Sequence, residues 1–141
     1  MSTVFIRHAR CFRRCMPKPR DLRVRSFQFA VDVVRFARSV ALDDAALRRL
    51  ALQLIDSVGS VGANLEEAAA GQTKRDFIAK TCIALKEARE SRFWLRLIAA
   101  SEPTVKERAQ PLHAESSEIV AMLIPAIKTA RSNPTRGQSQ D

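Results

Sequence analysis

The sequence predicts an all-α fold, namely a single antiparallel up-down-up-down four-helix bundle. The 141-residue chain is only 6% aromatic and contains no Tyr, four Gly and six Pro, a composition that suits helices better than sheets. Apolar residues recur at steps of three and four along four segments of roughly 20–28 residues. Because the connections between these segments are short, successive helices are expected to pack antiparallel.

The first helix is expected from about residue 21 or 22 to 41. It follows Pro17 and Pro19, and its apolar face is wide enough for neighbours on two sides. Asp43 or Asp44 is the predicted N-cap of the second helix.

The second helix is expected to end at Ala70, before Gly71, a residue favoured after helix ends. Gly59 and Gly62 lie inside this helix, where each costs roughly 1 kcal/mol relative to Ala. We therefore expect another helix to approach closely at the two glycines. Asn64 follows beside the apolar stripe, and its amide needs hydrogen-bond partners if it is buried.

The third helix is predicted to start after Thr73, with Asp76 completing a start that resembles a capping box. The fourth is expected over about 104–130, and Pro111 and Pro125 should kink or divide it. The domain organisation expected is a basic disordered arm over 1–20, the bundle over 21–131 and a disordered tail over 132–141.

Positive charge concentrates at the N-terminus. Residues 1–25 hold eight basic residues and one acidic residue, so eight minus one gives +7 of the net +9. Such an arm, with Arg10, Arg13 and Arg14, can bind phosphate backbones non-specifically. The alternatives are a solvated leader, a targeting peptide, or an upstream extension before a natural start at Met16.

Neither a metal site nor a cofactor is predicted. His8, Cys11 and Cys15 lack a fourth ligand and match no common zinc spacing. The carboxylates of Glu66, Glu67, Glu87 and Glu90 do not belong to Glu-x-x-His pairs, which a di-iron bundle would require. No phosphate-binding loop or nucleophile elbow occurs, so we predict that the protein is not an enzyme.

A row of arginines marks the third helix. Arg89, Arg92 and Arg96 are spaced at three and four and share one face, while Trp94 lies at a different azimuth. A basic face of this kind can contact phosphates, and Arg and aromatic groups can stack on unpaired bases. The alternative is a solvated face whose arginines pair with Glu87 and Glu90, with Trp94 at a subunit contact.

Several of these residues resemble a known family. Gln53, Ser60, Asn64 and Glu67 are similar to the second-helix signature of bacterial four-helix-bundle proteins first noticed as products of intervening sequences in 23S rRNA genes. Phe77 and the 84–95 segment, with Glu90, resemble the third helix of that family. The resemblance covers about residues 22–130. It implies that Asn64 and Glu67 fix the bundle structurally, as paired buried polar groups do.

The segment Arg92-Phe93-Trp94-Leu95-Arg96 is similar to a related branch, the accessory variability determinant of diversity-generating retroelements. This resemblance implies a homopentameric ring that binds RNA or DNA and a partner reverse transcriptase. On that analogy Arg89, Arg92 and Arg96 are the first candidates for binding nucleic acid, and the N-terminal arm is second.

The sequence thus predicts a non-enzymatic, cytoplasmic nucleic-acid-binding accessory protein, a homo-oligomer without a membrane segment that serves a reverse transcriptase. The rival hypothesis is a self-assembling, protein-interaction bundle with no nucleic-acid role. The residues expected to act structurally are Asn64, Glu67, Gly59, Gly62, Glu90 and Trp94.

Overall fold

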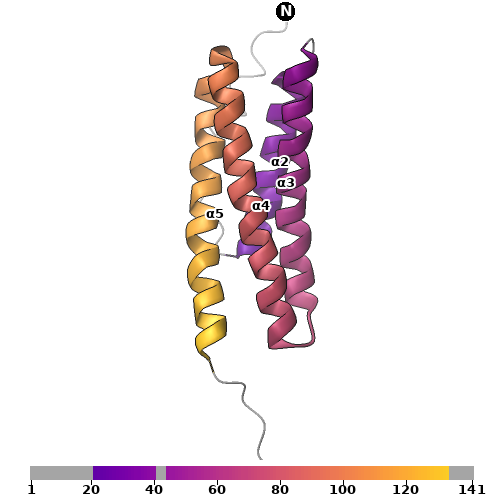
Figure 1. Cartoon of the computed structure of the whole chain (residues 1–141), viewed down its shortest axis with the longest axis vertical. Coiled ribbons are helices and arrows are strands. Elements are labelled where there is room, and N and C mark those ends of the chain that lie inside the picture. The colour runs from indigo at the N-terminus through magenta and orange to yellow at the C-terminus, as the bar shows by residue number, and fades with distance from the viewer. Residues whose placement is uncertain (1–20, 41–43, 134–141) are drawn as a thin grey trace, which may run out of the picture.

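The structure, a computed structural model, describes residues 21–40 and 44–133, which form long helices and no strand. Consecutive helices run in alternating directions and pack into one elongated bundle (Figure 1). The predicted all-α four-helix arrangement is confirmed. The elements are α2 (Leu22–Val40), α3 (Ala45–Ala70), α4 (Lys74–Ser101), a short 3₁₀ turn η1 (Pro103–Val105) and α5 (Lys106–Ser132).

Side-chain caps begin two of the helices as the sequence predicts. The Asp44 carboxylate accepts hydrogen bonds from the backbone N–H groups of Ala46 and Leu47, at 2.7 and 3.0 Å. The Thr73 hydroxyl oxygen accepts from the Asp76 N–H at 3.1 Å, and the hydroxyl donates to the Asp76 carboxylate at 2.5 Å. These bonds satisfy N–H groups that have no partner inside the first turn of a helix.

The predicted end of the second helix is confirmed, since α3 ends at Ala70 and Gly71 follows in an extended conformation with φ −62°. The expected division of the last helix is not found. Pro111 and Pro125 lie inside α5, which nevertheless continues from Lys106 to Ser132 without division. Both prolines are exposed, so water can satisfy the carbonyls that they leave without a helical N–H partner.

The core is one apolar cluster to which every helix contributes one face. α2, α3 and α5 contribute mostly large side chains to this cluster, whereas α4 contributes the small Ala84 and Ala88 besides Leu95 and Ile98. Small residues there allow the backbones to approach, which matters for the α4–α5 contact described below. The principal members are Phe29, Val33, Phe36, Leu54, Val58, Val61, Leu65, Ala84, Ala88, Leu95, Ile98, Ile119 and Leu123.

The α2–α5 contact closes the bundle. Arg25 of α2 is buried and its guanidinium forms an ion pair with Glu115 of α5. Arg108 of α5 donates to the Ser39 hydroxyl and lies over the Phe36 ring, 5.6 Å from its centroid. Polar contacts therefore fasten α2 to α5 on either side of the apolar core.

The close approach expected at Gly59 and Gly62 is wrong within this chain. A Cβ built on either residue would meet no heavy atom within 4 Å outside the local helix backbone. Gly59 is exposed and Gly62 half-buried, because both lie on the flank of α3 and not on its core-facing side. The glycines leave open space on the surface of the described bundle.

Candidate nucleic-acid interface

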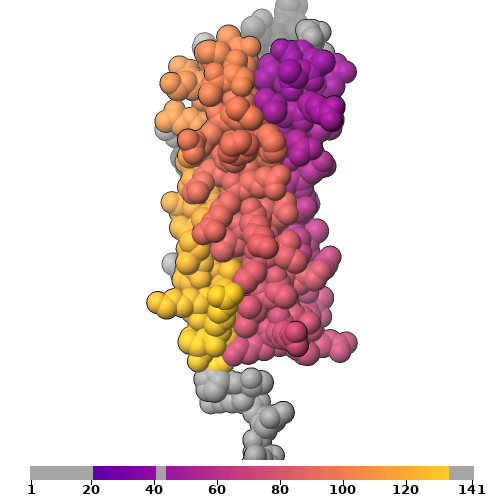
Figure 2. Space-filling model, in the orientation of Figure 1, coloured from indigo at the N-terminus to yellow at the C-terminus, as the bar shows by residue number. Residues whose placement is uncertain are grey.

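The predicted arginine row lies on the flank of α4 that faces α5. Ala88, Ser91 and Leu95 of α4 face the core. Each is followed directly by an arginine of the row, and successive residues of a helix are rotated by about 100° about its axis. All three arginines therefore lie on the same side of α4. Arg89 and Arg96 line hollows shared with α5. We call this boundary between the two helices the α4/α5 seam, and Figure 2 shows α4 and α5 side by side along one face of the molecule.

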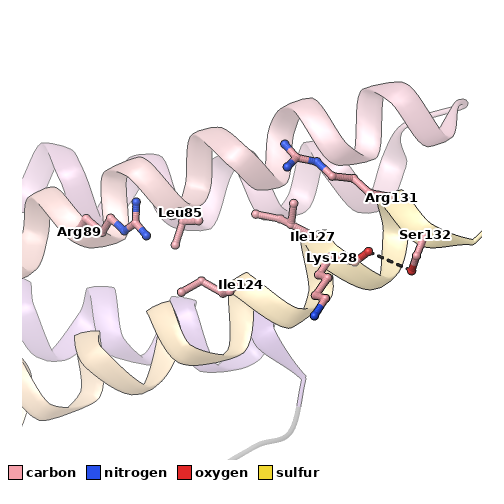
Figure 3. A pocket seen from close by; sticks show the side chains of 7 residues that line it. All are labelled: Leu85, Arg89, Ile124, Ile127, Lys128, Arg131 and Ser132. Atoms are coloured by element: carbon pink, nitrogen blue, oxygen red, sulfur yellow. Dashed lines mark hydrogen bonds between the residues drawn. The ribbon is translucent and has the colours of Figure 1, made fainter.

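A lower hollow lies between the middle of α4 and the end of α5, with a volume of about 540 Å³. Apolar side chains form its floor, and in Figure 3 Leu85 of α4 and Ile124 of α5 point toward one another. Its cationic residues come from both helices. The lining comprises Leu85, Arg89, Ile124, Ile127, Lys128, Arg131 and Ser132.

An upper hollow of about 280 Å³ lies nearer the α4–α5 connection. It combines Arg96 of α4 with Lys106, Gln110 and His113 of α5 above an apolar floor. No acidic residue of the described ranges lines either hollow. The full lining is Leu95, Arg96, Ala99, Lys106, Ala109, Gln110 and His113.

Two buried serines join the helices between the hollows. The hydroxyls of Ser91 on α4 and Ser116 on α5 both donate to the Ala88 carbonyl, at 2.9 and 3.0 Å. Their oxygen atoms lie 3.2 Å apart. These side chains hold α4 against α5 at the middle of the seam, so the cations of the two helices stay in a fixed relationship.

The seam therefore carries six cationic side chains. Within residues 21–40 and 44–133, none of them forms an ion pair with a carboxylate. The alternative in which the arginine row pairs with Glu87 and Glu90 is thus not found there. The cations are Arg89, Arg92 and Arg96 of α4 and Lys106, Lys128 and Arg131 of α5.

His113 reports the positive potential of the seam. Its pKa is lowered from the usual value, chiefly because partial burial disfavours the charged imidazolium and further because Arg92 and Arg96 repel it. A ring that resists protonation beside two guanidiniums marks a surface suited to an anion.

Trp94 and Glu90 lie beside the arginine row and not within it. The Trp94 indole N–H donates to the Glu90 carboxylate at 3.0 Å, and the ring packs against the apolar core. Trp94 also makes an edge-to-face contact with Phe93, with ring centroids 5.0 Å apart. Phe93 is 52% exposed. Phe93 was not among the predicted site residues, although the sequence places it four residues after Arg89 and three before Arg96.

Asn64 and Glu67 are not the buried polar pair that the resemblance implied. The half-buried Asn64 amide donates to the Ser60 carbonyl of its own helix at 2.9 Å. Glu67 is exposed and forms an ion pair with Lys80 of α4. The Glu67 side chain is longer and lies at the surface, so it can reach Lys80 of α4. The shorter Asn64 side chain bonds within its own helix.

The remaining candidates divide into two groups. Arg10, Arg13, Arg14 and the possible ligands His8, Cys11 and Cys15 lie outside the described residues. Among the residues that are described, no three His, Cys, Asp or Glu side chains gather as around a metal ion, and no helix is long and apolar enough to cross a membrane.

The fold and the seam define a four-helix bundle with a cationic groove on one face. The chain belongs to the 23S rRNA-intervening sequence protein family, whose family model matches residues 20–125. The predicted family membership is confirmed. The resemblance to the retroelement accessory determinant gains no support from this match and stays a prediction.

One solved structure extends the likeness. It is a protein of unknown function from the S23 ribosomal protein family of Bacteroides thetaiotaomicron. That structure is 34% identical in sequence and has a TM-score of 0.68, and the similarity covers 76% of this chain and 95% of the other. No curated protein sequence matches the chain.

Proposed function

We propose that this protein binds RNA through the α4/α5 seam and catalyses no reaction. The observation that carries the proposal is a set of six seam cations, drawn from two helices along one boundary, that have no carboxylate partner within the described part of the chain. Elsewhere in the described bundle, Arg25 and Lys80 are engaged by carboxylates. Cations free of such partners can release the counterions of a phosphate backbone, which is the main source of affinity for nucleic acid.

The length of the seam fits a short stretch of backbone. Arg131 contacts the Cys82 sulfur at 3.5 Å, and Ala99 lines the upper hollow, so the seam runs along α4 for at least the 17 residue steps from Cys82 to Ala99. At 1.5 Å per residue this is about 25 Å. With one phosphate per 3.4 Å of strand, about seven phosphates fit along it. The family name, which refers to an intervening sequence of 23S rRNA, favours RNA as the nucleic acid.

Salt-dependent binding of the full chain to a 20-nucleotide RNA tests the proposal. Changing Arg89, Arg92 and Arg96 together to Ser should weaken binding and reduce the slope of log K against log salt by about 2, from roughly 0.7 per lost contact on a single strand. The control changes Arg38 and Arg49, two exposed arginines with no carboxylate partner among the described residues, together with Arg35, which pairs with Asp32, to Ser. It removes the same charge away from the seam.

A third variant separates the seam from the N-terminal arm. Changing Arg10, Arg13 and Arg14 to Ser in the full chain removes the same charge from the arm. If only this variant loses affinity, the arm and not the seam binds RNA. If the seam variant and the control lose affinity equally, binding depends on net charge alone and the proposal fails.

We also infer self-assembly, because several large apolar side chains are exposed on the α2 and α3 surfaces. Val24 and Leu52 are each 53% exposed and Phe27 is 68% exposed. Patches of this kind mark protein contacts. The molar mass by light scattering tests this, with a pentamer expected from the resemblance and Phe27→Ser expected to shift the mass toward the monomer. A monomeric wild-type protein would contradict it.

The proposed service to a reverse transcriptase rests on the resemblance of the 92–96 segment. Co-purification of the protein with a reverse transcriptase encoded beside its gene is the expected outcome. If such an enzyme is present and does not bind, the accessory role is rejected while RNA binding by the seam stands.

A further inference from the structure

We propose that Phe93 makes the α4/α5 seam a site for unpaired nucleotides, so that the protein prefers single-stranded nucleic acid to a duplex. This inference rests on the proposed function, because it assumes that the seam cations hold the phosphates. The cations contact only phosphates, which single strands and duplexes share. Phe93 would recognise an exposed base face, which only an unpaired nucleotide offers.

The position of Phe93 is the first observation. It follows Arg89 by four residues and precedes Arg96 by three, and side chains at those spacings are neighbours on a helix surface. Half of its surface is exposed although it is large and apolar. Phe93 thus borders the arginine row on the side away from the core, where a base attached to a seam-bound phosphate would reach.

The support beneath Phe93 is the second observation. The Trp94 ring meets Phe93 at 69°, with the centroids 5.0 Å apart, and Trp94 is itself held by its hydrogen bond to Glu90. A ring that is already positioned pays little conformational entropy when a ligand packs on it. Proteins that bind single strands without sequence preference combine cations, which contact the backbone, with an aromatic side chain, on which a base stacks. Phe93 and the neighbouring arginines provide this combination on one helix surface.

A duplex is expected to gain less affinity than a single strand from Phe93 beside the arginine row. In a duplex the base faces are stacked on one another, so only the groove edges and the backbone are open to a helix surface. An exposed phenyl ring then gains nothing, whereas an unpaired base stacked on it contributes roughly a 5- to 150-fold gain in affinity.

The decisive comparison uses two oligomers with identical phosphates. One is a 20-nucleotide oligothymidylate and the other an abasic 20-mer, each titrated against the full chain. We expect the oligothymidylate to bind at least about fivefold more tightly. Phe93→Leu, which keeps an apolar side chain against Trp94, should abolish most of this ratio while leaving abasic binding unchanged. Phe93→Tyr should retain the ratio.

Phe27→Leu on α2 is the matched control, since Phe27 is 68% exposed and lies away from the seam.

A second readout is intrinsic fluorescence, because Trp94 is the only Trp in the chain. Oligothymidylate should perturb the emission of the wild type more than the abasic oligomer does, and Phe93→Leu should remove that difference. A 20-base-pair duplex RNA should bind less tightly than a 20-nucleotide oligouridylate of the same strand length.

Two results overturn the inference: equal affinity of the wild type for the two oligomers, or a ratio that survives Phe93→Leu, whatever Phe27→Leu does. Failure of the proposed function looks different, because abasic binding would then be unaffected by loss of Arg89, Arg92 and Arg96. Comparing oligouridylate with oligothymidylate decides between RNA and DNA as the source of the unpaired nucleotides.

Discussion

Arg25 of α2 and Glu115 of α5 form a two-pronged ion pair that joins the first and last helices of the bundle. The Arg25 Nε atom lies 2.5 Å from one Glu115 carboxylate oxygen, and a terminal nitrogen lies 3.2 Å from the other. The Arg25 side chain is only 9% exposed, and its pKa is raised mainly by the hydrogen bond to Glu115. The contact connects segments 90 residues apart in sequence.

Breaking this pair on one side should be costly. Arg25→Met leaves the Glu115 carboxylate in a partly dry site, and Glu115→Gln leaves the buried guanidinium with only the exposed Glu118 carboxylate, 3.7 Å away. We expect each to lower the free energy of unfolding by about 2–4 kcal/mol in urea denaturation. The double variant should lose less than the sum of the two single losses. Strict additivity would show that the two side chains do not interact.

Gly62→Ala should stabilise the protein. The added methyl meets open space, and alanine in a helix interior is favoured over glycine by roughly 1 kcal/mol. This reverses the sequence-based expectation that a larger residue would overfill a helix contact there. Thermal unfolding of the variant measures the effect.

Gly71→Ala is the contrasting substitution for that experiment. A Cβ there would lie 3.3 Å from the Ala68 carbonyl oxygen, and Gly71 lies beyond the helix, so no comparable gain is expected. If Gly62→Ala destabilises the protein, another chain or segment occupies the space beside Gly62.

Ser91→Val should destabilise the bundle and also disturb the seam. Ser91 is fully buried against Ser116 and the Ala88 carbonyl, so a larger apolar side chain must push α5 away. Overpacking of this kind costs typically 1–3 kcal/mol. Ser91→Ala, with no added bulk, should cost about 1 kcal/mol and preserve RNA affinity. Equal RNA binding by the Val variant would show that helix separation does not matter for the seam.

His113 should make RNA binding depend on pH. In the free protein its pKa lies below the usual value because of burial, Arg92 and Arg96. Phosphates that neutralise the two arginines favour the imidazolium, so binding takes up a proton. Affinity at fixed ionic strength should therefore rise as pH falls through the pKa range of His113. His113→Gln should flatten this rise, and an unchanged profile would place the phosphates elsewhere.

The same pKa has the opposite consequence for folding. A base whose pKa is lower in the folded state than in the unfolded chain contributes its full stability above the unfolded value of about 6.5. As pH falls below that value the unfolded chain binds the proton first, and stability is lost. Unfolding free energies from pH 7.5 to 5.5 should fall more for the wild type than for His113→Gln; parallel curves would contradict the shift.

Local sequence rules predicted the helices well, because their determinants are local. The side chains of Asp44 and Thr73 accept hydrogen bonds from N–H groups only two or three residues further along the chain. Both caps can therefore be recognised from neighbouring residues in the sequence. The continuity of α5 was missed because the cost of Pro111 depends on exposure. A sequence alone does not tell that the freed carbonyl faces water.

The seam was only half predicted for a related reason. Helical spacing placed Arg89, Arg92 and Arg96 on one face, but Lys106 and Arg131 joined them only once α5 was packed against α4. Likewise the exposure of Phe93 depends on which neighbours cover it, and no pattern within α4 decides that. Groups contributed by two helices emerge from the packing.

α2 is shorter than the helices it accompanies, with 19 residues against 26 to 28 in the others. Figure 1 shows that it stops short of the end where α3 joins α4 and α5 finishes. Among residues 21–40 and 44–133, no fourth helix therefore lies beside the last turns of α5, which carry Lys128 and Arg131. Their amide hydrogens should exchange with solvent faster than those near Ser116, because local opening there disrupts fewer packed side chains. Ordering these turns would then reduce the net affinity for RNA, and bound RNA should slow the exchange of their amide hydrogens.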